Sequence, residues 1–539
     1  MSADRDATAS PIDATTGALD PAIWGPPDRI VELVARNVST RYLAIVVDGL
    51  IGLLVLPFNV AHLGKSAYGL WALTTSITWF FGVLDLGYSG ALVKFVAQYR
   101  AWRDHTALNE VVSTIGMVFT ALGGLCFAVT AVIAWHIAWL FHLDPQQADT
   151  ARQLLLIIGA YLSVQLPISV FGAVVYGFQR FHRNNAVSIC LSIVVAIVNV
   201  SVLGTGHGLV ALVASTTAVR ILFLGAFVWN AYRVFPGLRV KPSLFRRARL
   251  REVTVFSVYM AVLDWSAKLN YSSDTMVIGA MLDTSAIALW TVGQRLTQLA
   301  QQLTSQLNGA LFPAVVDSDA TERQDQLQLI LIQGTKLSLA LAAPLCLGLI
   351  ALAGPLITRW VGPQFTASIL PLQIMLTIVL VRNVTASATL ILRGAGEHRL
   401  LTYTNAAAAV ANVVLSIALV RPLGLLGVAL GTLIPVAASS LFVLYPAACR
   451  RVHMPVSVPL ARAVWPALWP AAIMAAALKF GPRVPPTTLF EVALYLAVGG
   501  LLYAGLFAGL AIGADERRFY WTKLLTIVVR RPRVPAAAA

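Results

Sequence analysis

Residues 63–71 read LGKSAYGLW, and residues 282–290, which begin 219 positions later, read LDTSAIALW. Five of the nine positions carry the same residue in both stretches. At the same offset and with no gap, Gly90-Ala91-Leu92 then aligns with Gly309-Ala310-Leu311. A match of this length, across a turn and the apolar helix after it, indicates that the chain contains two copies of one unit.

The composition predicts a membrane protein. Of the 539 residues, 58% are apolar and 12% are charged, which is about half the charged share of a soluble protein. Apolar runs of roughly 18 or more residues, long enough to cross a bilayer, recur along almost the whole chain. These runs are too long and too uniformly apolar for barrel strands, and backbone groups in lipid must be satisfied internally. We therefore expect an all-α polytopic membrane protein.

We expect about fourteen transmembrane helices. Their approximate limits are 39–61, 67–99, 108–140, 152–178, 184–203, 208–234, 253–281, 285–316, 328–357, 366–392, 400–420, 424–447, 461–480 and 488–512. Six spans are an even number, so both copies enter the membrane from one side and form a parallel repeat. The expected parts are a disordered cytoplasmic tail (1–37), two six-helix lobes (38–236 and 253–449) joined by a basic linker (237–252), two extra helices (450–513) and a basic tail (514–539).

The net charge of +15 reflects topology better than it reflects a nucleic-acid partner. The densest basic cluster lies between spans six and seven, at Arg233, Arg239, Lys241, Arg246, Arg247, Arg249 and Arg251. Cytoplasmic loops are rich in Lys and Arg, so both termini and this linker are expected in the cytoplasm, at a plasma membrane. The linker also suits contact with anionic lipid headgroups, although topology alone accounts for it.

Ionisable and amide side chains recur inside the expected spans. They are costly in lipid and normally face a partner, the bundle interior or a water-filled cavity. In chain order the candidate residues are Arg41, Asp48, Asp85, Arg220, Asp264, Lys268, Arg295, Gln298, Gln302 and Arg382.

Two interpretations of these residues stay open. Structural ion pairs and hydrogen bonds between helices explain any single one. A shared aqueous cavity explains the set better, because four cations in the spans have no acid close in sequence: Arg220, Arg295, Lys336 and Arg382. Such cations would attract an anion, and a guanidinium suits a phosphate or diphosphate through its planar fork of donors. The deep acids either neutralise the cations or bind a proton or sodium ion that drives transport.

No motif of an enzyme stands out. The cysteine spacing fits neither a metal site nor a disulfide framework, and there is no phosphate-binding glycine loop or nucleophile elbow. The acidic segment 317–325 reads as solvated surface, with a metal site as the alternative. No cofactor is expected.

The opening stretch, followed by LDLGYSGALVKF at residues 84–95, resembles the N-terminal signature of bacterial oligosaccharide flippases. These belong to the multidrug/oligosaccharidyl-lipid/polysaccharide exporter superfamily. GAGE at 394–397 resembles a cytoplasmic turn of the second lobe, and the resemblance covers roughly residues 35–450. It implies two lobes around a central cavity that opens to each side in turn. The cavity-lining helices of the family point here to Arg41, Asp48, Asp85, Asp264, Lys268 and Arg295.

The resemblance implies a flippase for an undecaprenyl-diphosphate-linked oligosaccharide, in a membrane where a polysaccharide polymerase is a candidate partner. Arg295, Lys268, Arg220 and Arg382, with Arg41, would bind the diphosphate. Gln298 and Gln302 would bind sugar, and Asp48, Asp85 and Asp264 would couple ions. The alternatives are a cation-coupled multidrug exporter on the same scaffold, and a membrane glycosyltransferase or polysaccharide polymerase.

Overall fold

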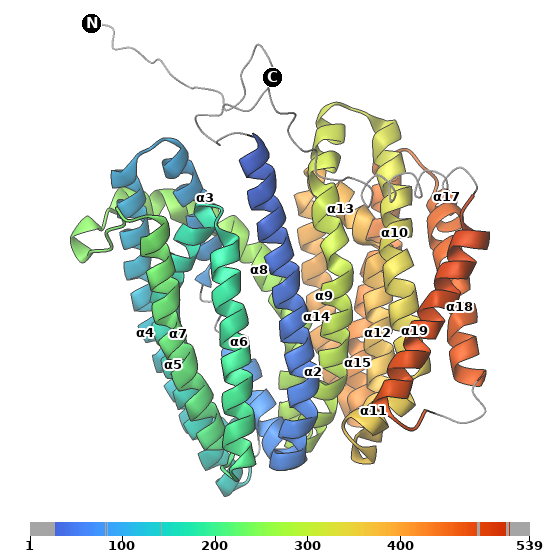
Figure 1. Cartoon of the computed structure of the whole chain (residues 1–539), viewed down its shortest axis with the longest axis horizontal. Helices are drawn as coiled ribbons and strands as arrows, with labels where there is room; N and C mark the ends of the chain where they lie inside the picture. Colours follow the sequence, from blue (N-terminus) through green and yellow to red (C-terminus); the bar gives the residue numbers. More distant parts are fainter. Residues whose placement is uncertain are drawn as a thin grey trace, which may run out of the picture. The chain divides into compact units, whose positions relative to one another are not determined.

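The computed structural model describes residues 27–80, 82, 85–141, 143–481, 486–513 and 517. Side chains at 27–35, 258–272, 306–310 and 312–314, among others, lie outside that description. Every regular element in the described ranges is a helix, which confirms the all-α fold (Figure 1). The chain divides into two compact units, Met1–Ala288 (unit 1) and Leu289–Ala539 (unit 2). Most of the expected terminal tails lies outside the described residues.

Unit 1 is a bundle of long helices. In it α4 packs against α5, α5 and α6 pack against α7, α2 packs against α6, and α3 and α8 pack against α4. The α4–α5 pair meets through small residues, since Gly159 lies against the Thr130 side chain. The elements are α2 (Pro27–Phe80), α3 (Tyr88–Ala101), α4 (His105–Phe141), α5 (Pro145–Gly177), α6 (Phe181–Gly204), α7 (Leu209–Val234), η2 (Pro242–Leu244), α8 (Arg247–Met281) and residues 284–288 of α9 (Thr284–Ala320).

Unit 2 contains the rest of α9 and a second bundle, in which α10 packs against α12 and α18 and α14 packs against α15. The last two long helices, α18 and α19, pack on α10, where Gly348 lies beside Leu496 and Met474. The elements are α10 (Gln324–Ala351), α11 (Ala353–Trp360), η3 (Pro363–Ser368), α12 (Ile369–Val384), α13 (Ala386–Gly394), α14 (His398–Leu423), α15 (Leu425–Ala437), η4 (Ala438–Leu444), α16 (Tyr445–Arg451), α17 (Ser457–Pro459), η5 (Leu460–Val464), α18 (Trp465–Phe480), α19 (Leu489–Leu506) and η6 (Phe507–Ala511).

The helices confirm a multi-pass membrane protein. Among the described residues, 11 helical stretches are long and apolar enough to cross a membrane. One of them, Ser39–Thr78, has 40 residues, or about 60 Å, so it is long enough for two crossings. The helices α8 and α9 have 35 and 37 residues and are not among the 11, and part of each lies outside the described side chains. The number fourteen therefore stays a prediction.

Two breaks interrupt the chain around the opening stretch. Gly64 has φ 75° and ψ 171°, so α2 bends at the expected turn. The sequence predicted one span over 67–99, but α2 ends at Phe80 and α3 begins at Tyr88. Between them Leu86 and Gly87 have φ values of 50° and 75°. This left-handed turn cannot continue a right-handed helix, so the expected second span is two helices.

The two copies of the opening motif contact each other inside unit 1. The hydroxyl oxygens of Ser66 and Thr284 are 3.3 Å apart, and Gln147 Nε2 donates to Ser66 Oγ at 3.0 Å. A Cβ added to Gly69 would overlap the carbonyl oxygen of Thr284. The absence of a side chain at Gly69 therefore lets α2 and the start of α9 approach closely, as small residues do between membrane helices.

Gly69→Ala is expected to destabilise the protein by about 2 kcal/mol or more, because the new methyl group meets backbone that cannot rotate away. The thermal unfolding midpoint in detergent should fall by several degrees. Gly124→Ala is the matched control, since nothing lies within 4 Å of an added Cβ at that position. Equal midpoints for Gly69→Ala and the unaltered protein would contradict the close approach.

Candidate functional site

The helix α9 has one face that packs within unit 2. Near its start, Ser368 Oγ donates to the Leu289 carbonyl oxygen at 2.7 Å. Four turns further on, Asn383 Nδ2 of α12 donates to Thr304 Oγ1 at 3.2 Å, and both residues are buried. Polar contacts at both ends therefore fix this face of α9 along η3 and α12.

The opposite face of α9 carries the predicted glutamines. At 100° per residue, Gln298 and Gln302 lie about 120–180° around the helix from Gly293 and Thr304, which face α12. Both glutamines are exposed. Arg295 lies on the same side and is half-buried. The packing of α9 therefore turns this arginine and both amides away from the helices of unit 2 that hold α9 in place.

The contacts between α9 and α12 also show how far along the helix axis Arg382 lies from Arg295. Gly293 faces Leu372 and, eleven residues later on each helix, Thr304 faces Asn383, so α9 and α12 run parallel. Arg382 is half-buried and lies roughly two turns, or about 12 Å, further along the axis than the predicted arginine of α9. The two arginines thus belong to one pair of packed helices, at different depths.

In unit 1, the side chain of Arg220 on α7 lies near the hydroxyl group of Tyr161 on α5 and interacts with it electrostatically. Arg220 is exposed, and Leu222, on nearly the opposite side of α7, is 76% exposed. A leucine suits lipid, whereas a guanidinium inside a span needs water or polar partners. The two sides of α7 are therefore chemically distinct at this depth.

Arg41 and Asp48 lie seven residues apart on α2 and are both exposed. Asn59, eleven residues further along α2 than Asp48, is buried. Thr40, beside Arg41, accepts a hydrogen bond from Asn185 Nδ2 at 3.1 Å. This contact joins α2 to α6 at the level of Arg41.

The remaining predicted residues are not on regular, fully described spans. Asp85 lies in the break between α2 and α3, where the sequence had placed it inside a helix. Its Oδ1 accepts a hydrogen bond from the Ser89 backbone N–H at 3.0 Å, so this carboxylate caps the start of α3. Asp264 and Lys268 belong to α8, but their side chains lie outside the described residues.

The structure adds a feature that the sequence did not predict: the basic linker is bonded to the start of α4. Asn109 Nδ2 donates to the Gly237 carbonyl oxygen at 3.0 Å, and Asn109 Oδ1 accepts from the Arg239 N–H at 2.9 Å. Ser113 Oγ donates to the Arg239 carbonyl oxygen at 3.1 Å and accepts from the Lys241 N–H at 3.2 Å. Two side chains of α4 thus satisfy the linker backbone as a neighbouring strand would.

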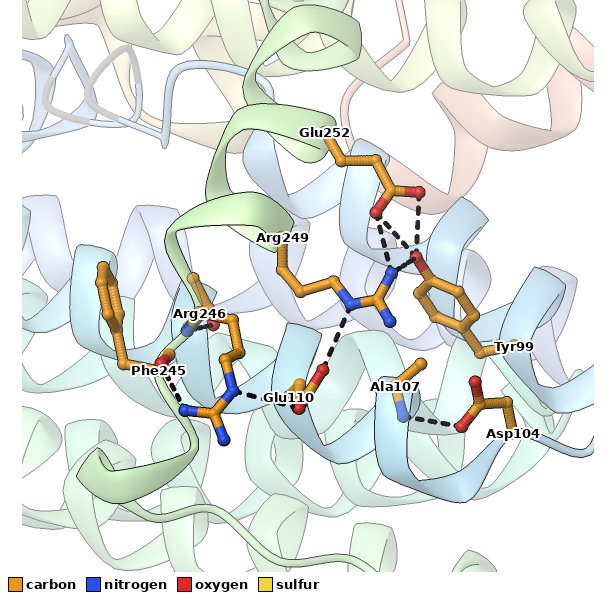
Figure 2. A network of polar contacts seen from close by, with 9 residues as sticks. Tyr99, Asp104, Ala107, Glu110, Phe245, Arg246, Arg249 and Glu252 are labelled. Atoms are coloured by element: carbon orange, nitrogen blue, oxygen red, sulfur yellow. Dashed lines mark hydrogen bonds and ion pairs between the residues drawn. The ribbon is translucent and has the colours of Figure 1, made fainter.

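A charged network continues this contact into α8 (Figure 2). The Glu110 carboxylate accepts from Arg246 Nε and from Arg249 Nε, each at 3.3 Å. Arg249 Nη1 also donates to the Tyr99 hydroxyl at 2.9 Å and to Glu252 at 3.2 Å, and the Tyr99 hydroxyl donates to Glu252 at 2.8 Å. Partial burial lowers the pKa of Arg249, but its hydrogen bonds to the carboxylates of Glu252 and Glu110 and the nearby negative charge outweigh that effect and raise it.

The sequence did hold a signal for this contact. Asn109 and Ser113 form one i,i+4 pair and Glu110 and Thr114 form another, so polar residues line one side of α4 at its start. Thr114 Oγ1 in turn accepts from the Arg246 N–H at 3.0 Å. The partners lie about 130 positions later in the chain, which no local pattern reveals.

Loosening the linker should expose it to trypsin. In the double variant Asn109→Ala and Ser113→Ala, cleavage after Arg239 is expected to accelerate at least about tenfold, because each of the four lost hydrogen bonds stabilises the closed linker by about 1 kcal/mol. Thr120→Ala is the control, since that hydroxyl bonds only within α4, to the Gly116 carbonyl oxygen. Unchanged cleavage in the double variant would contradict the anchoring.

The acidic segment forms ion pairs rather than a metal centre. Asp317 pairs with Arg323 at 2.9 Å, and Asp319 pairs with Arg451 at 2.6 Å. Among the residues that the structure describes, no group of three or more His, Cys, Asp or Glu is placed to hold a metal ion.

The fold defines the class: a multi-pass, all-helical membrane protein with arginines and glutamines on its long helices. The chain belongs to the polysaccharide biosynthesis protein family, whose model matches residues 62–370. The resemblance to the oligosaccharide flippases that the opening stretch suggested is confirmed by this match and by the relatives.

Two relatives bear names that include a role. The chain is 22% identical over 495 residues to the probable flippase AglR of Haloferax volcanii, which covers 90% of this chain and 97% of the relative. It is 21% identical over 230 residues to the probable low-salt glycan biosynthesis flippase Agl15 of the same organism, which covers 43% of this chain and 47% of that relative. Both names describe flippases and not enzymes.

Among solved structures, the fold is similar to that of the lipid II flippase MurJ in an inward closed conformation. The TM-score is 0.68 at 15% identity, over 87% of this chain and 98% of MurJ. An inward-facing multidrug resistance transporter of the MATE family gives a TM-score of 0.63 at 15% identity, over 75% of this chain and 94% of that one. At these identities the likeness concerns the fold alone.

Proposed function

We propose that the chain is a flippase that moves an undecaprenyl-diphosphate-linked oligosaccharide across a bacterial plasma membrane, for cell-surface polysaccharide synthesis. Membership of a polysaccharide biosynthesis family and the likeness to AglR over nearly the whole chain support a glycan-linked substrate. Both termini and the basic linker face the cytoplasm in this proposal, because the linker concentrates the positive charge. A polysaccharide polymerase would receive the product.

The polar face of α9 is the observation that carries the proposal. Gln298 and Gln302 are exposed on a helix whose other face is packed. Polar side chains on the exposed face of a membrane helix are costly in lipid, so we place this face against water or substrate. An amide group both donates and accepts hydrogen bonds, as a sugar hydroxyl group does. These side chains therefore suit a sugar, whereas an apolar drug would not need them.

The cations supply the second half of the recognition. We assign Arg295 and Arg382 in unit 2, and Arg220, Arg41 and Lys268 in unit 1, to the diphosphate. The guanidinium groups offer paired donors that match phosphate oxygens, which a single ammonium does not. Arg295 and Arg382 lie at different depths on the packed helices α9 and α12. This arrangement suits a ligand that moves through the membrane in steps.

Alternating access of two lobes, residues 38–236 and 253–449, completes the proposal. Asp48, Asp85 and Asp264 would couple ions or balance the cations. The Asp85 carboxylate also accepts a hydrogen bond at the start of α3. A substitution of Asp85 would therefore disturb that helix in addition to any ion binding.

A deletion strain separates the proposal from the rival drug exporter, which the MATE-like fold also suits. Loss of the gene should stop surface polysaccharide export and cause lipid-linked oligosaccharide to accumulate inside, with no change in sensitivity to cationic drugs. Normal polysaccharide together with raised drug sensitivity would replace the flippase by the exporter.

A further inference from the structure

Five basic residues of the segment 233–251, which also supplies Arg246 and Arg249 to the network of Figure 2, have exposed side chains. We name this group the basic linker surface; it comprises Arg233, Arg239, Lys241, Arg247 and Arg251. The substrate proposal does not use these residues.

The linker that carries these residues is held in place by hydrogen bonds and by buried side chains. The linker backbone is bonded to Asn109 and Ser113, as described above, and Phe235 and Leu238 are buried in a core with side chains of α3, α4 and α5. The cations therefore project from an ordered platform and lose less entropy on binding than cations on a flexible loop would.

The carboxylates of this region are already engaged elsewhere. Glu110 and Glu252 bind Arg246 and Arg249, which are not part of the basic linker surface. Among the described residues no ion pair involves any of the five cations, and the one aromatic contact places Arg233 over the Trp229 ring at 4.7 Å. The first turn of α8 also lacks an acidic residue, although a helix start favours negative charge. The region thus presents positive charge that the described part of the protein leaves uncompensated.

Exposed aromatic residues place this surface at the depth of the lipid headgroups. Trp229 and Tyr232 stand in the last turns of α7, where the span ends, and both are exposed, as is Phe245 of the linker. Trp and Tyr concentrate where membrane helices meet the headgroups, because one part of the ring system is apolar and the other polar. Cations at this level would lie among the phosphate groups of the lipids.

We propose that the basic linker surface binds the headgroups of anionic phospholipids in the leaflet that meets this end of unit 1. Charge complementarity selects the class of ligand, since each Lys or Arg at an anionic membrane surface adds to the attraction. Phe245 and Trp229 contact the interfacial region while the five cations engage phosphates. The bound lipids hold the linker and the start of α8 against the membrane plane.

The test uses the full chain, purified in neutral detergent, and phosphatidylglycerol and phosphatidylcholine as probes. Native mass spectrometry gives the apparent dissociation constant of each lipid. The unaltered protein is expected to prefer phosphatidylglycerol. In the quadruple variant Arg239→Gln, Lys241→Gln, Arg247→Gln and Arg251→Gln, binding of phosphatidylglycerol should weaken by at least about tenfold. Binding of phosphatidylcholine should not change.

A matched variant removes the same charge from exposed positions in unit 2: Arg393→Gln, Arg399→Gln, Arg450→Gln and Arg462→Gln. It should keep the preference for phosphatidylglycerol. Equal losses in both variants would overturn the proposal, because net charge alone would then explain binding. Two other results would also overturn it: retention of the full preference in the linker variant, or binding of an acidic peptide such as polyglutamate to the linker in place of the lipid. Unchanged circular dichroism spectra establish that each variant is folded.

Discussion

Replacing Arg295 by alanine is expected to lower polysaccharide export by at least about 30-fold while the protein remains in the membrane at its normal level. The packing of α9 turns Arg295 away from α12, to the side that holds Gln298 and Gln302. If this guanidinium binds the diphosphate, its removal costs about 2–5 kcal/mol, because a desolvated phosphate oxygen loses a charged partner. Quantification of surface polymer and of lipid-linked precursor in the same cells measures the effect.

Two further variants make this prediction specific. Arg295→Lys keeps the charge but loses the planar fork, so export should fall to an intermediate level. Arg450→Ala removes an exposed arginine at the end of α16, outside the proposed site, and should export normally. Normal export in Arg295→Ala would remove Arg295 from the diphosphate site.

The second large effect concerns the glutamine face. In the double variant Gln298→Leu and Gln302→Leu, export should fall about 10- to 100-fold, because sugar hydroxyls would enter the site and find no partners. The thermal unfolding midpoint should stay within about a degree, since both positions are exposed and leucine favours helix.

The packed face of α9 supplies the contrast. Gly293→Leu should reduce the amount of folded protein, since even a Cβ at Gly293 meets the Met375 side chain at 2.9 Å. Substitutions on the glutamine face of α9 should therefore lower export without lowering stability. A substitution on the packed face should lower stability. A stable, fully active glutamine variant would show that this face does not contact substrate.

Most helices could be predicted from the sequence because long apolar runs have few alternatives in lipid. The expected span 208–234 is α7, and the expected span 184–203 lies within α6. The break inside 67–99 was missed because its residues are mostly apolar. Yet Gly87 and the preceding Asp85 are the residue types that end one helix and cap the next, so the signal was present.

The polar face of α9 could be predicted because its spacing follows the helical period. Its environment could not, since the contact between Thr304 and Asn383 joins positions 79 apart. The partner of Arg220 was missed for the same reason: Tyr161 belongs to another helix. The platform under the linker depends on Asn109 and residues about 130 positions later, so the sequence showed the charges but not their support.

The most direct measurement of the central claim is flipping by the purified protein. Proteoliposomes would contain undecaprenyl diphosphate linked to a fluorescently labelled oligosaccharide, and an impermeant quencher would be added outside. The account predicts that the intact protein lets the quencher reach nearly all of the label, while Arg295→Ala leaves about half protected, as do vesicles without protein. Half protection with the intact protein, in vesicles where it transports a cationic drug, would contradict the account.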